Sequence, residues 1–124
     1  MIDDMGIFRT SFDVANTKRP RKRVHLQDVM VDTGSEYNWV PKRVLQQLGI
    51  RPERVDGFET ADGRIIERSV GFALFFAAGR STPTVVVFAE PGDSVLLGAH
   101  ALEGLNLRVD LVLKELIPAG PVRW

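Results

Sequence analysis

The sequence predicts an all-β protein of one domain, residues 1–124, built as a closed, barrel-like sheet with two short helices. Short runs rich in valine, isoleucine and phenylalanine recur along the chain, and turn signals containing glycine, proline or aspartate separate them. Helical patterning is confined to two short segments. A length of 124 residues, a hydrophobic fraction of 44% and a charged fraction of 26% are ordinary for one globular domain.

Six runs have the composition or patterning of β-strands. They are expected at residues 6–16, 24–32, 70–76, 84–89, 107–112 and 116–118. The first two are predicted to form a hairpin around a basic turn at 17–23 (TKRPRKR). Turns are also expected at 77–83 (AAGRSTP) and at 91–93 (PGD).

Two segments predict short helices. In 41–50 (PKRVLQQLGI), Pro41 suits a first helical position and the apolar residues share one face. Gly49 then supplies a stop signal at the C-terminal end. The second helix is expected at 99–104 (AHALEG).

Composition excludes several classes of function. The 16 basic and 16 acidic residues cancel, so no overall field favours nucleic acid or an anionic membrane. Without cysteine there are no disulfides, thiolate nucleophiles or Cys-based zinc sites, and two histidines, His25 and His100, are too few for most His-metal sites. We therefore expect no metal and no cofactor. The longest apolar stretch, 70–79, is half the ~20 residues of a membrane helix. With no secretory layout at the start, a cytoplasmic protein is expected.

The most informative string is VMVDTGSEYNWVP, at 29–41, in which an apolar strand ends at Asp32. The strand would hold the carboxylate at the floor of a groove, and Gly34 would let backbone N–H groups approach it closely. Thr33 and Ser35 place hydroxyl groups beside it, and hydrogen bonds to a carboxylate lower its pKa. Taken alone, the Asp-Thr-Gly tripeptide is equally compatible with a simple turn at a strand end.

A second motif lies downstream and consists of Leu96, Leu97 and Gly98. An apolar strand ending in Asp-Thr-Gly, followed later by two hydrophobic residues and a glycine, resembles the retropepsin-like aspartic proteases of retroviruses and bacteria. The order and spacing of the two motifs both agree, and the resemblance covers roughly 24–118.

The resemblance implies the acid-protease fold and places several residues around one site. The paired leucines would lie beneath the Asp32 loop, and the helix after Gly98 would pack under the site. Thr33 of each subunit would cross-link the two loops of a dimer. Family members act on peptide or protein substrates without a cofactor.

The hairpin GFETADGRIIE, at 57–67, lies between the two motifs and carries an Asp-Gly turn signal. At this position the resembling family has its flap, a mobile hairpin that closes over the bound peptide. Ala61, Asp62 and Gly63 at the tip would contact the peptide main chain. An ordinary surface hairpin is the alternative, and only the position between the motifs favours a flap.

Aspartic proteolysis needs two carboxyl groups that share one proton. Asp32 is the only aspartate in a strand-Asp-Thr-Gly context. Asp28 is expected on the same side of its strand, but four residues of strand separate the two by ~13 Å. The second carboxylate is therefore predicted to come from another copy of the chain, in a symmetric homodimer.

These observations predict an aspartic endopeptidase, a hydrolase whose site forms between two subunits. The alternative is a catalytically silent dimer of the same fold that binds peptides. The basic run at 17–23 could contact nucleic acid, but a solvated loop is favoured because the whole chain is neutral. Trp39, Val40 and the surroundings of Phe88 are candidate groove residues, while core positions are favoured for Tyr37 and Trp39.

Overall fold

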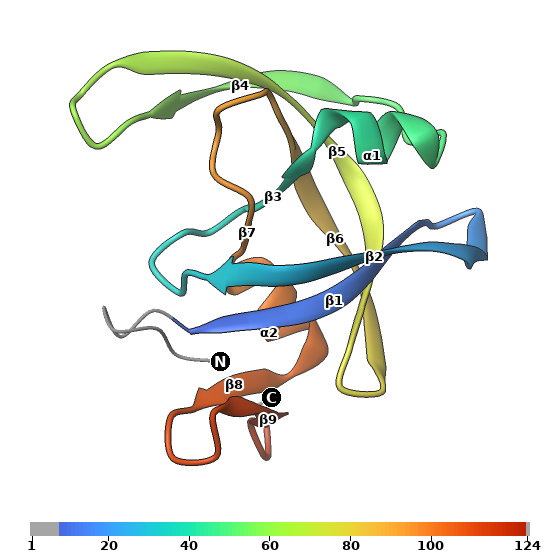
Figure 1. Cartoon of the computed structure of the whole chain (residues 1–124), viewed down its shortest axis with the longest axis vertical. Helices are drawn as coiled ribbons and strands as arrows, with labels where there is room; N and C mark the ends of the chain where they lie inside the picture. Colours follow the sequence, from blue (N-terminus) through green and yellow to red (C-terminus); the bar gives the residue numbers. More distant parts are fainter. Residues whose placement is uncertain (1–7, 124) are drawn as a thin grey trace.

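A computed structural model describes residues 8–123 as one closed ring of strands with a small separate sheet (Figure 1). The larger sheet has the order β1-β2-β7-β3-β6-β5-β4, and an additional pairing of β1 with β5 closes the ring. The predicted all-β, barrel-like fold with two short helices is confirmed. The elements are β1 Arg9–Asn16, β2 Arg19–Val31, β3 Asn38–Pro41, α1 Lys42–Gln47, β4 Arg54–Glu59, β5 Ile65–Ala77, β6 Arg80–Ala89, β7 Leu96–Leu97, α2 Ala99–Leu105, β8 Leu107–Asp110 and β9 Glu115–Pro118.

The first hairpin is present, but its turn is shorter than the sequence predicts. Residues 19–23 of the basic run belong to β2, where Arg19 and Arg23 pair with β1 on either side of a register shift, which leaves only Thr17 and Lys18 in the turn. The Asn16 side chain fixes this tight turn by accepting a hydrogen bond from the Lys18 amide at 2.9 Å. The cations at 18–23 are exposed on a ribbon that projects beyond the barrel (Figure 1), so their charge does not oppose pairing. Residues 6 and 7 of the predicted first strand lie outside the described residues.

The second long hairpin, β5 and β6, also turns more tightly than expected. Instead of a loop at 77–83, Ala78 and Gly79 alone connect the strands, and both have left-handed backbone angles, with φ of 51° and 75°. Two successive left-handed residues match the twist of an antiparallel ribbon, so pairing continues up to the turn. The left-handed conformation of Gly79 therefore determines where β5 ends and where β6 begins.

A bulge in β2 changes which side chains face the core. The pairing of β1 with β2 shifts between Thr10 and Phe12, where Asp28 takes a left-handed conformation with φ of 53°. Regular alternation would turn Asp28 inward, but the bulge leaves it exposed and buries Val29. The prediction that Asp28 and Asp32 lie on one side of a regular strand is therefore wrong.

The two helices flank the ring and complete the core. Helix α1 is shorter than predicted because Pro41 still belongs to β3, and Gly49 ends the helical segment with φ of 72°, as expected. Its apolar face is buried against the barrel, as is that of α2, which begins and ends close to the predicted bounds. Within the described range 8–123, strands β8 and β9 pair only with each other, and residues 111–114 form the turn between them. Neither helix is long and apolar enough to cross a membrane.

Candidate active site

The end of β2 places Asp32 beside the second sequence motif. Strand β7 runs parallel to β2, pairing Met30 with Leu96 and Val31 with Leu97. The Asp32 backbone amide continues this ladder by donating to the Leu97 carbonyl oxygen at 3.0 Å. Both leucines are buried, so the two motifs, distant in sequence, form one packed unit.

The turn after Asp32 holds its carboxylate with backbone groups. The Gly34 amide donates to Asp32 Oδ1 at 3.0 Å, and the Ser35 amide donates to the Asp32 carbonyl oxygen at 3.1 Å. A side chain at position 34 would place its Cβ 3.3 Å from the same Oδ1, so the carboxylate would have to shift slightly to accommodate it. The Ser35 hydroxyl donates to the Tyr37 carbonyl oxygen at 3.1 Å rather than to the carboxylate. The Ser35 hydroxyl thus stabilises the loop and makes no hydrogen bond with the Asp32 carboxylate.

The loop is held from below by the start of α2. The Ala99 amide donates to the Ser35 carbonyl oxygen at 2.7 Å, and the His100 amide donates to the Glu36 carbonyl oxygen at 3.0 Å. Gly98 permits this approach, because a Cβ there would lie 2.3 Å from the Tyr37 carbonyl oxygen. The site thus requires glycine at position 98 for close backbone contact.

Sequence reasoning missed Asn38, the fully buried amide that joins these segments. Its Oδ1 accepts from the Gly98 amide at 2.8 Å, and its Nδ2 donates to the Val85 carbonyl oxygen at 2.9 Å. A buried polar group of this kind is stable only when it is hydrogen-bonded. An asparagine between Tyr37 and Trp39 at the start of an apolar strand was the available signal.

Strands β4 and β5 form a hairpin with its tip at 60–64, which is called the flap because it lies at the predicted flap position. The Thr60 amide donates to the Arg64 carbonyl oxygen at 2.8 Å, and Gly63 adopts φ of 85°, which glycine allows without strain. The exposed Asp62 side chain accepts a hydrogen bond from the Thr60 hydroxyl and pairs with Arg64. These contacts, that of Thr60 above all, hold the pKa of Asp62 below its usual value. Asp62 and Gly63 thus build the turn itself.

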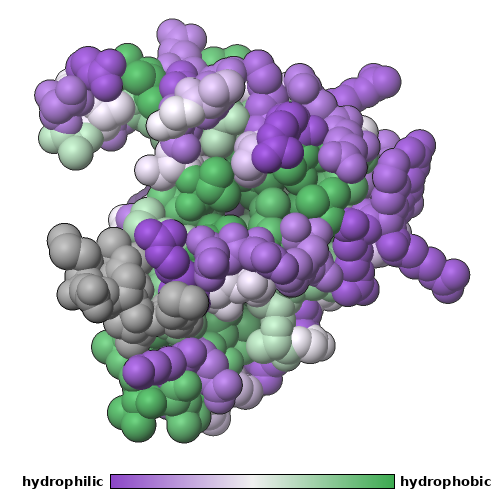
Figure 2. All heavy atoms as spheres, in the orientation of Figure 1, coloured by the Kyte–Doolittle hydropathy of each residue, from purple (hydrophilic) through white to green (hydrophobic). Residues whose placement is uncertain are grey.

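A hollow of about 380 Å³ separates the Asp32 loop from the flap. Figure 2 shows the molecule indented below the flap on this side. Asp32 and Ser35 lie on one wall and Ala61 of the flap tip on the other. Of the three predicted tip residues, only Ala61 lines this hollow together with Asp32. Its other lining residues are Trp39, Phe58, Glu59, Thr60, Ile66, Asp93, Ser94 and Leu96.

Some of the candidate groove residues near the Asp32 loop line the hollow, and others are buried in the core. Trp39 lines the hollow and packs edge-on against Phe58 of the flap arm at 5.0 Å between ring centroids. Val40 is buried in the core, so its assignment to the groove is wrong, and Phe88, whose surroundings were a candidate, is buried there as well. Val40 faces inward because side chains alternate along β3, and Trp39 at the neighbouring position takes the other face. Tyr37 is half-buried and contacts Phe58.

A second hollow, of about 490 Å³, lies on the other side of Asp32. Asp32 and Thr33 line it together with Phe8, Met30, Val31, Val109 and Leu111. Thr33 is exposed, and its side chain makes no hydrogen bond among residues 8–123. Asp32 therefore stands between a hollow that faces the flap and one that faces the β8–β9 sheet.

The sequence that forms this site matches a known protein family. A model of the aspartyl protease family matches residues 9–101, which is most of the chain and includes both motifs. The chain belongs to the aspartyl protease family. The match confirms the resemblance to retropepsin-like aspartic proteases that the motifs at 32–34 and 96–98 suggested.

Individual proteins show only weak sequence similarity to this aspartyl protease. Among solved structures, the solution structure of simian foamy virus (mac) protease is similar, with 19% sequence identity and a TM-score of 0.49. The similar region covers 76% of this chain and 92% of the viral one. No curated protein matches the chain at a significant level.

Two further carboxylates line the flap-side hollow of this aspartyl protease, Glu59 and Asp93. Glu59 is exposed on the flap arm, away from the floor of the hollow. Asp93 accepts two hydrogen bonds from Arg68, at 2.6 and 2.9 Å, and another from the Glu90 amide at 2.8 Å. The Arg68 bonds lower the pKa of Asp93, so it is ionised and already paired. Asp93 is thus poorly suited to share a proton with Asp32.

The Arg68–Asp93 pair joins the flap arm β5 to the loop before β7. Both side chains are largely shielded, with 19% and 13% of their surface exposed. Because the pKa of Asp93 is lowered by folding, its contribution to stability is present above the ordinary aspartate pKa and is lost as pH falls through the lowered value. The pair therefore stabilises the base of the flap in mildly acidic solution.

We expect Asp93→Asn to lower the free energy of unfolding at neutral pH by about 2 kcal/mol, because Arg68 loses charged hydrogen bonds. The difference in unfolding free energy between this variant and the wild type should shrink at strongly acidic pH, where Asp93 is protonated in both the folded and the unfolded state. Urea unfolding across a pH series measures both effects. Asp62→Asn, at an exposed pair, is the matched control and should change stability little. A stability difference between Asp93→Asn and the wild type that grows toward acidic pH would contradict a stabilising role for the Arg68–Asp93 pair.

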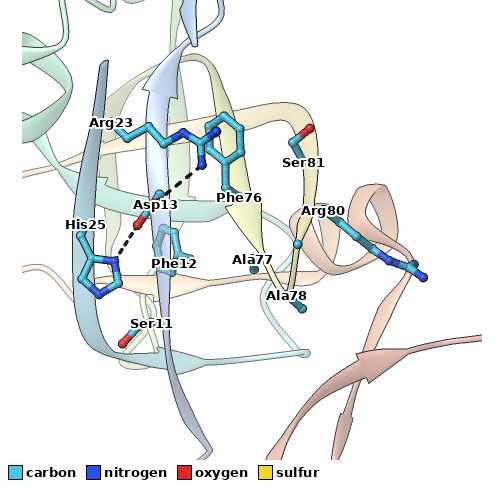
Figure 3. Close-up of a pocket in the computed structure, with 11 residues that line it drawn as sticks. Ser11, Phe12, Asp13, Arg23, His25, Phe76, Ala77, Ala78, Arg80 and Ser81 are labelled. Atoms are coloured by element: carbon cyan, nitrogen blue, oxygen red, sulfur yellow. Dashed lines mark hydrogen bonds and ion pairs between the residues drawn. The ribbon is translucent and has the colours of Figure 1, made fainter. Parts of the chain in front are cut away.

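A further hollow lies beside β1, β2 and β5 (Figure 3), and none of its lining residues lines either hollow that contains Asp32. His25 Nδ1 contacts Asp13 Oδ1 at 2.6 Å, and the Arg23 guanidinium lies 3.5 Å from the centre of the Phe76 ring. These contacts link neighbouring strands on a solvent-exposed surface, where such pairs contribute little stability. Arg23, from the basic run, is thus partly engaged within the fold. Among residues 8–123, no three acidic, cysteine or histidine side chains are grouped to hold a metal ion.

Proposed function

We propose that this protein is an aspartic endopeptidase whose active site forms where two copies bring their Asp32 side chains together. The observation that carries the proposal is the placement of Asp32. Its loop is bonded to β7 and to α2, and it faces Ala61 of the hairpin tip across a hollow. One carboxylate per chain stands in this position, and the chemistry requires two.

In the proposed reaction, an ionised Asp32 takes a proton from water as the water oxygen attacks the carbonyl carbon of a peptide bond. The protonated Asp32 of the second copy donates a hydrogen bond to the carbonyl oxygen and supplies the proton for the departing amine. The Gly34 amide orients the carboxylate. The exposed Thr33 side chain would bond the opposite loop.

The hollow favours an extended peptide as substrate. Trp39 and Phe58 provide apolar surface on two different elements, and Ala61 leaves room for a main chain beneath the flap tip. Closing the hairpin over the peptide would remove water from the reacting bond. Asp62, held by Thr60 and Arg64, would keep the tip in one conformation during closure.

The test is cleavage of a mixed peptide library at acidic to neutral pH, with and without a statine-type transition-state mimic. We expect cleavage that the mimic blocks. Binding of the mimic without cleavage would instead support the catalytically silent peptide-binding dimer. Sedimentation equilibrium reports the oligomeric state of the same sample, and activity from a strict monomer would refute the shared site.

A further inference from the structure

Four cationic side chains of the first hairpin make no hydrogen bond or ion pair with residues 8–123. They are Lys18, Arg19, Arg21 and Lys22, and all four are exposed. No aspartate or glutamate occurs between residues 14 and 27 that could neutralise them. Elsewhere on the barrel, cations such as Lys42 and Arg68 pair with carboxylates. The hairpin therefore carries a local positive charge in a chain that is neutral as a whole.

A second bulge in β2 interrupts the pairing of this hairpin. The register shifts between Ala15 and Asn16 of β1, so residues 20–22 of β2 have no paired residue there. The Arg23 Nε closes the bulge by donating to the Pro20 carbonyl oxygen at 3.3 Å, and bulges of this kind re-aim side chains. The hairpin projects at the right of Figure 1, and Figure 2 shows hydrophilic side chains covering this end. The cations within the bulge are therefore presented to solvent.

A hollow of about 590 Å³ lies between the tip of the hairpin and the segment after α1. Three cations from these two segments line it, and they are Lys18, Arg19 and Arg51. The Asn16 Nδ2 holds the two segments together by donating to the Leu48 carbonyl oxygen at 3.1 Å. Among the described lining residues, Glu53 is the one carboxylate. The hollow therefore favours an anionic ligand.

An exposed aromatic ring lines the same hollow. Phe72 of β5 has 50% of its surface exposed, whereas Phe75 on the same strand is fully buried. Bases of single-stranded nucleic acids stack on exposed aromatic rings while their phosphates bind nearby cations. An acidic protein segment would meet the same cations but would leave the ring without a stacking partner, and a duplex keeps its bases stacked on one another. The combination of ring and cations therefore favours a single strand.

We propose that this surface binds a single-stranded nucleic acid. One base stacks on Phe72, the neighbouring phosphates contact the three cations of the hollow, and the cations of the bulge continue the contact along the hairpin. The neutral total charge, which favoured a solvated loop at 17–23, does not oppose this binding, because charges more than about 10 Å apart are largely screened in solution. None of the lining residues lines either hollow that contains Asp32, so binding is independent of peptide cleavage.

Fluorescence anisotropy of a labelled single-stranded oligonucleotide of about 12 nucleotides tests the proposal on the full chain. Three phosphate contacts predict that the Kd rises roughly 20-fold between about 50 and 200 mM salt. A Kd that does not change with salt would overturn the proposal. An unlabelled duplex and a polyglutamate peptide should both compete poorly. Competition by polyglutamate as strong as that by the unlabelled single strand would also overturn it, in favour of an acidic protein partner.

Two substitutions separate stacking from charge, and circular dichroism verifies the fold of each variant. Phe72→Leu keeps an apolar side chain but removes the ring, so we expect the Kd to rise about tenfold with an unchanged salt dependence, whereas Phe72→Tyr should bind like wild type. Arg51→Ala should reduce the slope of log K against log salt by about 0.7. Arg108→Ala is the matched control, since Arg108 is exposed on β8 and does not line the hollow. Wild-type affinity in Phe72→Leu, or equal losses in Arg51→Ala and Arg108→Ala, would overturn the assignment.

Discussion

Replacing Asp32 by asparagine should abolish peptide cleavage while leaving the fold and the dimer intact. Asparagine has the same shape, and its carbonyl oxygen can still accept the Gly34 amide hydrogen bond made at 3.0 Å in the wild type. It can neither accept a proton from water nor share one across a dimer. Because general acid and general base are lost together, we expect a decrease of at least about 1,000-fold in kcat. Fluorogenic peptide assays measure the loss.

Asp28→Asn provides the matched control for this substitution. Asp28 is exposed on the same strand, and its left-handed backbone conformation suits asparagine as well as aspartate. Activity should stay near that of the wild type. Near-normal cleavage by Asp32→Asn, or equal losses in the two variants, would contradict the assignment of the catalytic carboxylate.

Mixing wild-type and Asp32→Asn chains tests whether each active site uses two chains. After subunit exchange, an excess of Asp32→Asn should suppress wild-type activity, because mixed dimers contain only one carboxylate. Activity that depends only on the amount of wild type added, despite demonstrated exchange, would mean that a single chain holds a complete site.

Gly98→Ala should cause the largest loss of stability among single substitutions near the site. The new Cβ would lie 2.3 Å from the Tyr37 carbonyl oxygen and 2.7 Å from that of Ser35. Both are backbone atoms of the loop, so the loop must move away and weaken the bond between the Ala99 amide and Ser35. We expect the free energy of unfolding to fall by at least about 3 kcal/mol. Urea denaturation followed by circular dichroism measures it.

Gly57→Ala is the control for the loss of a glycine. Its added Cβ would lie 3.4 Å from the end of the Ile65 side chain, an ordinary contact in the flap arm. Stability should change by less than about 1 kcal/mol. If Gly98→Ala were as stable as this variant, the close packing of the loop on α2 would not constrain the site.

The local geometry of the Asp32 loop could be predicted because the sequence around it determines which backbone groups can approach the carboxylate. An apolar strand ending at Asp32, followed by a glycine, predicts a carboxylate bonded by backbone amides, and the Gly34 amide makes that bond. Gly98 in turn permits a close backbone approach. The hairpin at 57–67 followed from its Asp-Gly turn, and the hydrophobic face of α1 followed from its spacing.

Strand ends and individual contacts could not be predicted in this way. The basic run at 17–23 has the composition of a loop, yet most of it lies in β2, because Arg19 and Arg23 pair with the neighbouring strand β1. The bulge at Asp28 depends on the register between β1 and β2, which no local pattern specifies. Asn38 and the Arg68–Asp93 pair join segments that are distant in sequence.

The sequence by itself determined the all-β class, the position of an aspartate at the end of an apolar strand and the need for glycine beside it, because these follow from composition and backbone sterics over a few residues. Only the tertiary structure decided which groups meet. It placed Leu97 beside Asp32, Trp39 under the flap and Leu111 next to Thr33. Such contacts depend on how the closed sheet brings distant strands together, and local sequence does not encode that register.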